Sequence, residues 1–209
     1  MKGAAQIMFT RKVMAMLLLS TLLHLIGFVS PGWFFMTVKH VKLHVGIWYG
    51  VICDANACSS DTIGNLNQTY FKFKDLEPLS SVLSKYQVLA AIALAASLIS
   101  ILANIVHRRT NKKLRSMWAV GICIICIFLS GILGIVTSAH FANRLRYATN
   151  YLATLGEENP YSVPYSIVFT GLGGLVALIA YSIVAYNVAM DRDRKEITNV
   201  NEVYSLRQI

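Results

Sequence analysis

The chain has 209 residues, of which 56% are hydrophobic and only 14% carry charge. A soluble domain has about 25% charged residues, and the mean hydropathy here is +0.55, so the composition excludes an ordinary water-soluble domain. The formal net charge is +9. Because basic residues gather beside apolar segments, we interpret this charge as a membrane-orientation signal that also favours anionic lipid headgroups, and we expect no nucleic-acid partner.

Four segments are long enough to cross a lipid bilayer, which takes about 20 apolar residues. They are 13–30, 86–106, 117–139 and 165–189, and none contains Lys, Arg, Asp or Glu. Only helices and closed barrels satisfy their backbone hydrogen bonds in lipid, so we expect four transmembrane helices. The first segment follows basic residues as a signal peptide does, but no Ala-x-Ala cleavage site comes after it, which favours a retained span.

Basic residues also predict the orientation of these spans. The loop 107–116 contains five Lys or Arg residues and no acid, and more basic residues stand near both ends of the chain. We therefore expect both termini, this loop and the tail 190–209 in the cytosol of a multi-pass plasma-membrane protein. The loops 31–85 and 140–164 then lie outside. Asn67 begins the chain's only N-glycosylation sequon, and its position in the first outside loop agrees with this orientation.

The first outside loop carries β-strand signals. The ranges 33–41 and 43–52 are rich in β-branched and aromatic residues, and 69–74 alternates with period two, so each is predicted to be a strand. An isolated hairpin is only marginally stable in water. We therefore expect a small antiparallel sheet that rests on the outer ends of the helices.

Two cysteines of this loop, Cys53 and Cys58, are separated by four residues. Their spacing suits a hairpin-like closure and the outside compartment is oxidising, so we predict a disulfide bond between them. The alternative is half of a zinc site. No further cysteine lies outside the membrane, and His40, His44 and His140 are scattered, so we expect no metal.

Three features inside the spans need a separate interpretation. Cys123 and Cys126 form a Cys-x-x-Cys motif in mid-span, where we expect packing residues because redox motifs need an exposed thiolate. His24 is ionisable and so a functional candidate by default. Since no span contains an acid, we expect a neutral histidine that is hydrogen-bonded to another helix. We expect close helix packing within the bundle, with a partner protein as the alternative, at the small residues Ser130, Gly131, Gly134, Gly171, Gly173, Gly174 and Ala177.

The series Trp33, Gly46-Ile47-Trp48, Cys53, Cys58 resembles the signature of the claudin superfamily, which has Trp, Gly-Leu-Trp and two cysteines in its first outside loop. That group includes claudins, peripheral myelin proteins and calcium-channel gamma subunits. Lys85 stands where the claudin pattern usually has Arg, and the run 137–140 with Arg144 resembles the end of the third claudin span. Ile in place of Leu, a shorter cysteine spacing and the missing Tyr-Val ending indicate a divergent claudin-like member.

The resemblance covers nearly the whole chain, 1–209, as one domain. It implies a mainly α-helical, left-handed four-transmembrane-helix bundle with a small antiparallel extracellular β-sheet. It also implies a protein of cell–cell contacts that associates with itself in cis and in trans, in adhesion or in a paracellular barrier or ion pathway. The alternative is an auxiliary, gamma-type subunit of an ion channel or receptor.

In claudins, charged residues after the second cysteine help to set ion selectivity. The candidates for contact or selectivity here have mixed signs, and so predict no selectivity: Lys72, Lys74, Asp75, Glu77, Lys85 and Arg144. Aromatic residues of the first outside loop are candidate anchors of a contact: Trp33, Phe34, Phe35 and Tyr70. The alternative, which we favour for Trp33 and Trp48, is packing at the bilayer interface, where tryptophan is enriched.

The sequence contains no catalytic constellation. No nucleophile stands beside a base, and the glycine-rich run 171–174 is embedded in a span and follows no strand, so it is no phosphate loop. We therefore expect no enzyme activity and no cofactor.

Overall fold

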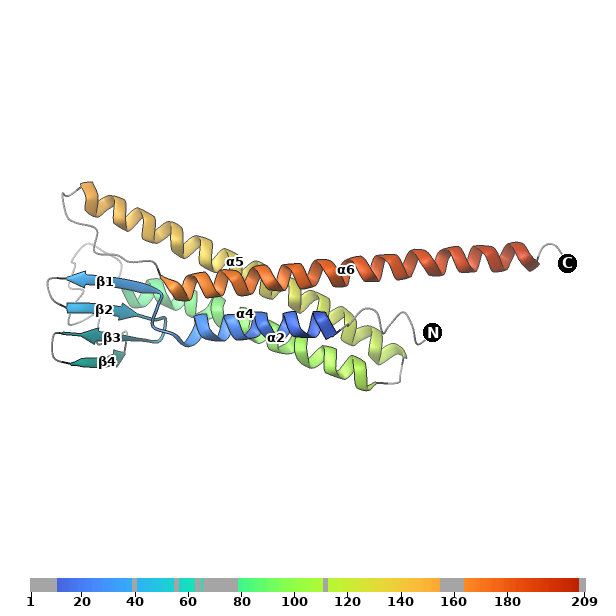
Figure 1. Ribbon diagram of the computed structural model, residues 1–209, viewed down its shortest axis with the longest axis horizontal. Helices are drawn as coiled ribbons and strands as arrows, with labels where there is room; N and C mark the ends of the chain where they lie inside the picture. The colour runs from blue at the N-terminus through green and yellow to red at the C-terminus, as the bar shows by residue number, and fades with distance from the viewer. Residues whose placement is uncertain are drawn as a thin grey trace.

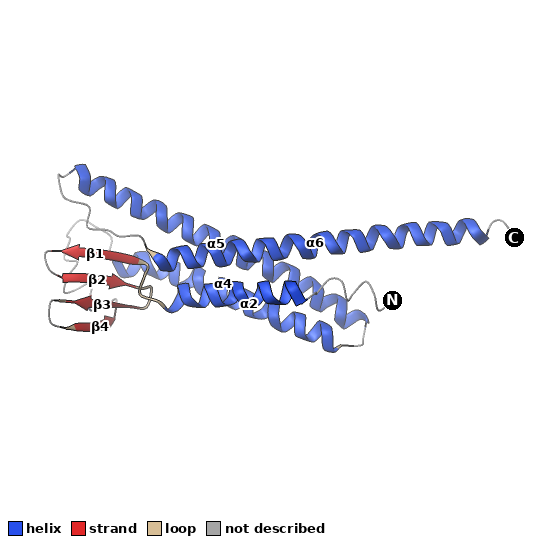
Figure 2. Ribbon diagram, in the orientation of Figure 1, coloured by secondary structure: helices blue, strands red, loops and turns tan. Residues whose placement is uncertain are grey.

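The computed structural model describes residues 11–38, 41–54, 57–62, 65, 79–110, 113–154 and 164–206. Within these residues the elements are four long helices and four short strands, and the strands lie at one end of the helical bundle (Figures 1 and 2). The helices are α2 (Arg11–Val29), α4 (Leu79–Arg109), α5 (Lys113–Thr154) and α6 (Tyr165–Leu206), and the strands are β1 (Phe34–Val38), β2 (Val41–Val45), β3 (Tyr49–Cys53) and β4 (Cys58–Thr62). The start of α2 and the end of α6 lie away from the sheet (Figure 1).

Each of the four helices is apolar enough over a sufficient length to cross a membrane. The stretches are Arg11–Val29, Leu83–Arg109, Met117–Tyr147 and Tyr165–Met190. In each, only 28% to 39% of an apolar segment of 18 residues is buried inside the protein. Most of this apolar surface therefore faces outward, where lipid is the solvent that suits it. The chain is a multi-pass membrane protein, and the expected mainly helical fold is confirmed. The left-handed sense of the bundle stays a prediction.

Three helices extend beyond the spans expected from the sequence. Helix α4 begins at Leu79, α5 continues to Thr154 and α6 to Leu206. The sequence analysis places the ends of the spans near charged residues. A charged residue marks the end of the segment that lies in lipid, but the helix itself can continue beyond it. No Pro or Gly interrupts the chain from 140 to 155 or from 175 to 209, so the helices continue into water. With 42 residues, α6 is about 63 Å long.

The helices form a closed ring in which α4 packs on α5, α5 on α6, α6 on α2 and α2 on α4. Glycines bring the backbones of α5 and α6 into direct contact. A Cβ added at Gly174 would lie 2.8 Å from the carbonyl oxygen of Gly131 and 2.9 Å from the backbone nitrogen of Ile135. The prediction that these small residues serve packing within the bundle is confirmed.

Cys123 and His24, two buried ionisable residues inside the spans, differ in their hydrogen bonding. Cys123 is fully buried among apolar side chains and its thiol donates to the carbonyl of Ser100 at 3.4 Å, so the expected packing role is confirmed for this residue. Cys126 is half-buried. His24 is also buried, but neither ring nitrogen has a hydrogen-bond partner among the described residues. The predicted hydrogen bond from His24 to another helix is therefore wrong.

The sheet is an antiparallel meander with strand order β1-β2-β3-β4. The first predicted strand is confirmed in β1. The second, 43–52, is wrong as a single strand, because the chain reverses at Gly46, whose N–H donates to the carbonyl of Tyr49 at 2.8 Å. The predicted strand 69–74 lies outside the described residues, and β4 was missed.

Alanine in place of Gly174 tests the close contact between α5 and α6. The new methyl group meets backbone atoms that cannot move aside, so we expect a lower free energy of unfolding by about 1–3 kcal/mol. Thermal unfolding in detergent measures the change. Gly121→Ala is the matched control, because a Cβ there meets nothing within 4 Å. Equal melting temperatures for the two variants would contradict the contact.

Candidate functional site

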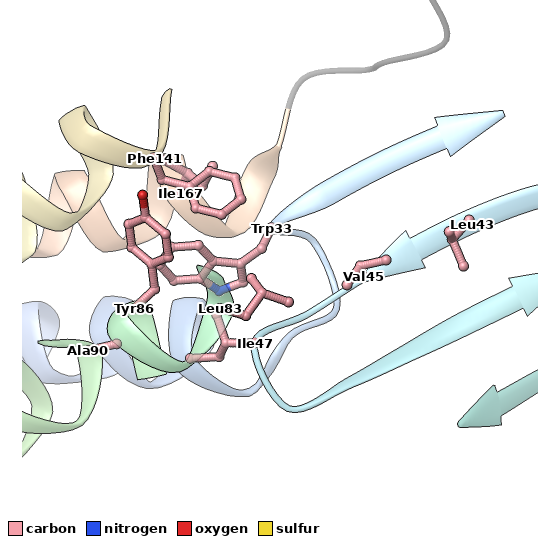
Figure 3. Close-up of a cluster of buried hydrophobic side chains, with 9 residues drawn as sticks. All are labelled: Trp33, Leu43, Val45, Ile47, Leu83, Tyr86, Ala90, Phe141 and Ile167. Carbon is pink, nitrogen blue, oxygen red and sulfur yellow. The ribbon is translucent and has the colours of Figure 1, made fainter. Parts of the chain in front are cut away.

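Trp33 joins the sheet to the helical bundle, and its side chain is wholly buried (Figure 3). Its indole Nε1 donates to the carbonyl of Gly27 in the last turn of α2 at 2.6 Å. Its backbone N–H donates to the carbonyl of Val45 in β2 at 3.0 Å. One residue therefore fixes the end of a membrane helix against the second strand.

An apolar cluster surrounds the Trp33 ring. The rings of Tyr86 on α4 and Phe141 on α5 lie 6.3 Å and 5.3 Å from it, between centroids. The cluster draws on the sheet, on the turn after β2 and on three helices, and consists of Trp33, Leu43, Val45, Ile47, Leu83, Tyr86, Ala90, Phe141 and Ile167 (Figure 3). Because large aromatic residues bury much area, this cluster is a strong hydrophobic link between sheet and bundle.

The three residues of the Gly46-Ile47-Trp48 turn have different surroundings. Gly46 packs so closely against the α2–β1 connection that an added Cβ would lie 3.0 Å from Pro31 Cα. Ile47 is fully buried, and its carbonyl accepts a hydrogen bond from the Gln87 side chain of α4. Trp48 is 44% exposed, with its ring 5.1 Å from that of Phe28.

The expected interfacial role of the two tryptophans is wrong for Trp33, because a side chain with no exposed surface cannot contact lipid. Its ring lies inside the junction of sheet and helices. For Trp48 the interfacial role stays a prediction.

A second connection, which the sequence analysis missed, ties the α2–β1 segment to the start of α6. The Ser30 and Ser166 hydroxyl oxygens lie 2.6 Å apart. The N–H of Gly32 donates to Ser166 Oγ at 3.0 Å, and the N–H of Ser166 donates to the Gly32 carbonyl at 3.1 Å. A Cβ at Gly32 would overlap the Tyr165 ring. These bonds satisfy backbone groups that a helix start leaves unpaired.

The predicted disulfide between Cys53 and Cys58 is confirmed. The two residues are partners in the register of β3 and β4. The turn that follows Cys53 is closed by the N–H of Asp54, which donates to the carbonyl of Ala57 at 3.0 Å, and by the N–H of Ala57, which donates to Asp54 Oδ1 at 2.8 Å. Both sulfur atoms are used in the bond, so the half zinc site is wrong.

The two edges of the described sheet differ in their surroundings. Strand β1 lies beside α6, where the Phe35 ring is 5.4 Å from that of Tyr165. Strand β4 lies on the far side (Figure 1), and all five of its residues are exposed. Their sequence is Cys-Ser-Ser-Asp-Thr, so the exposed edge strand of the described sheet is polar.

The remaining candidate residues fall into two groups. Lys85 on α4 and Arg144 on α5 are both exposed, and the neighbouring Tyr86 and His140 join these helices through a hydrogen bond of 2.7 Å between Tyr86 Oη and His140 Nδ1. The others lie outside the described residues and stay predictions: Asn67, Lys72, Lys74, Asp75 and Glu77.

The fold and this junction define a four-span membrane protein with a small, disulfide-linked antiparallel sheet held against one end of its helices. This layout is consistent with that of claudin-like proteins. No family model matches the chain, and no curated protein matches it.

Phenylalanine in place of Trp33 tests the junction. The change removes the indole donor and leaves the buried Gly27 carbonyl unpaired, which costs about 1–3 kcal/mol on its own. We expect a lower melting temperature in detergent and less protein at the cell surface. Trp48→Phe is the matched control, because that exposed ring donates no comparable bond in the described structure. An equal effect of the two substitutions would argue against the junction.

His44 in β2 provides a test by pH. Burial, and secondly the positive charge of Lys42, lower the pKa of His44 from its ordinary value of 6.5. Its contribution to stability is therefore fully present above pH 6.5 and is lost as the pH falls through the lowered value. NMR titration of the imidazole should show this pKa below that of the free peptide 41–45, and Lys42→Gln should raise it. A pKa at or above the peptide value would contradict the assignment.

Proposed function

We propose that this chain is a non-catalytic cell–cell contact protein of the plasma membrane, in which the sheet makes the contact. It associates with copies of itself, side by side in one membrane and head-on between cells, in adhesion or in a barrier or ion pathway between cells. The observation that carries the proposal is a sheet fixed to the membrane helices on one side, with a fully exposed strand, β4, on the other.

Charge supports an extracellular position for the sheet. The end of the bundle opposite the sheet holds Arg11 and Lys12 at the start of α2, and Arg108 and Arg109 at the end of α4, with α5 starting at Lys113 (Figure 1). Positive residues remain on the cytosolic side. This distribution of charge supports an orientation in which the bundle end that carries the sheet faces outward, as a contact between cells requires.

The rigid attachment of the sheet favours binding. Trp33 and its surrounding cluster hold β2 against three helices, and the Cys53–Cys58 disulfide holds β4 against β3. A surface that is ordered before it meets a partner loses little conformational entropy on binding. The polar side chains of β4 also limit indiscriminate association at a sheet edge.

A gamma-type auxiliary subunit of an ion channel or receptor is the second candidate. It is favoured by the length of α6, which continues as one helix past the membrane stretch ending at Met190 to Leu206. This extension measures about 24 Å and would give a channel partner a cytosolic surface to bind, in addition to the sheet.

A mixing experiment separates the two candidates. Cells that express the tagged chain are plated with naive cells, and its enrichment is compared at expressing–expressing and expressing–naive borders. The contact function predicts enrichment only where both cells express the chain. A uniform distribution overturns self-association between cells, and a channel or receptor partner should then co-purify with the chain in mild detergent.

A pair of variants locates the contact. Ser60→Lys places a charge in the middle of β4, and we expect it to remove border enrichment without changing the amount at the cell surface. Asn143→Lys places the same charge on an exposed position of α5 and should leave enrichment intact. Normal enrichment of the Ser60→Lys protein would show that the contact does not involve β4.

A further inference from the structure

A buried amide side chain joins α2 to α4 near the bundle end opposite the sheet. Asn104 on α4 has no exposed surface. Its amide nitrogen donates to the Met14 sulfur of α2 at 3.6 Å, and its Oδ1 accepts a hydrogen bond from Arg108 Nε at 3.2 Å. A thioether is only a weak acceptor, so the bond with Arg108 is the stronger of the two. The Asn104 side chain therefore holds the Arg108 guanidinium at the contact between α2 and α4.

Arg11 lies near this contact because α2 and α4 run in opposite directions, α2 toward the sheet and α4 away from it (Figure 1). From the contact between Met14 and Asn104, three residues back along α2 lead to Arg11, and four residues onward along α4 lead to Arg108. Both spacings keep a side chain on the same face of a helix. Two exposed arginines thus lie one helical turn beyond the same contact, on its side away from the sheet.

The charge around these two arginines is positive. Helices α2, α4 and α5 contain no Asp or Glu, and Lys12 and Arg109 add to the positive charge. In α6, the segment 191–195 contains two acids and three basic residues, so it supplies no net negative charge. Two guanidinium groups at one contact repel each other. An anion between them removes this repulsion, and phosphate oxygens match the planar donors of a guanidinium.

The surroundings of the two arginines are those of a lipid headgroup. Trp118, near the start of α5, is 68% exposed, and exposed tryptophan is typical of the membrane–water interface. On α2, Leu18 and Leu22 follow Arg11 by seven and eleven residues, which places all three on one helix face. These leucines are 52% and 53% exposed. A ligand of Arg11 therefore has an outward-facing apolar surface directly beside it, which a phospholipid can cover and a free phosphate ion cannot.

We propose that Arg11 and Arg108 bind the phosphate group of an anionic phospholipid at the contact between α2 and α4. Asn104 is the positioning residue that holds the Arg108 guanidinium, and an acyl chain of the lipid lies along Leu18 and Leu22. Basic pockets between transmembrane helices are typical sites for phosphoinositide headgroups. The site is at the opposite end of the bundle from the sheet, so it is independent of what the sheet binds.

Native mass spectrometry of the full chain, released from mild detergent, measures the lipid that stays bound. The probes are phosphatidylinositol bisphosphate and, as the neutral reference, phosphatidylcholine. We expect the phosphoinositide to be retained in preference to phosphatidylcholine, and an excess of inorganic phosphate to leave it bound. Equal retention of the two lipids would overturn the proposal. Displacement by inorganic phosphate would overturn the assignment to a lipid, because a free ion would then satisfy the same arginines.

Arg108→Gln and Arg109→Gln separate a built site from general attraction between charges. Each substitution removes one positive charge from the same end of α4, but only Arg108 bonds to Asn104 in the described structure. We expect Arg108→Gln to weaken phosphoinositide binding about tenfold, as loss of a charge-assisted hydrogen bond does, and Arg109→Gln to weaken it much less. Equal losses in the two variants would contradict the site.

Asn104→Leu tests the positioning role, because it keeps every charge and removes the acceptor that holds Arg108. We expect weaker retention of the phosphoinositide with unchanged retention of phosphatidylcholine, a difference that a general loss of structure does not produce. Unchanged phosphoinositide affinity in this variant would overturn the role of Asn104.

Discussion

The hydrogen bond from the Trp33 indole to the Gly27 carbonyl is the interaction on which the placement of the sheet depends. A helix end leaves its last carbonyls without partners inside the helix, and tryptophan has a single side-chain donor. The bond uses that donor to cap α2, while the ring fills the space between α4 and α5 beside Tyr86 and Phe141. Since the Trp33 backbone also bonds to β2, the position of the sheet follows from the end of α2.

The Ser30–Gly32–Ser166 connection adds a second constraint from a different helix. The α2–β1 segment is thereby held by α6 as well as by the Trp33 cluster, and a Cβ at Gly32 would collide with the Tyr165 ring. Two attachments on different helices restrict rotation of the sheet as well as its translation. Strand β4 is joined to this anchored sheet through its pairing with β3 and the Cys53–Cys58 disulfide.

The sequence predicted what depends on length and composition. Four apolar segments indicated four helices, and the spacing of Cys53 and Cys58 indicated their disulfide. It did not predict the break in 43–52, because Ile47 and Trp48 have high strand propensity. The turn depends on the hydrogen bond from Gly46 to Tyr49 and on the close approach of Gly46 to Pro31, which only the fold brings about. Strand β4 has no alternating pattern, since both of its faces are exposed, and it forms through pairing with β3. Of the candidate site, the burial of Trp33 could not be read from the sequence, because an interfacial and an internal tryptophan share the same local pattern.

The cluster inside the spans and the cluster at the sheet are stabilised by different interactions. In lipid, no hydrophobic force drives helices together, so association depends on small residues and polar contacts. The cluster inside the spans accordingly contains no aromatic residue among its fully buried members: Val13, Leu17, Ala103, Cys123, Ile127, Ala177, Ala180 and Val184. At the sheet, where water is near, the buried cluster contains Trp33, Tyr86 and Phe141, because removing large rings from water is favourable there. Substitutions at the sheet junction therefore change the hydrophobic contribution to stability, whereas substitutions at the glycines of the bundle change the close packing of helices. Gly27 takes part in both, because it packs closely against Thr170 of α6 and its carbonyl accepts the Trp33 indole bond.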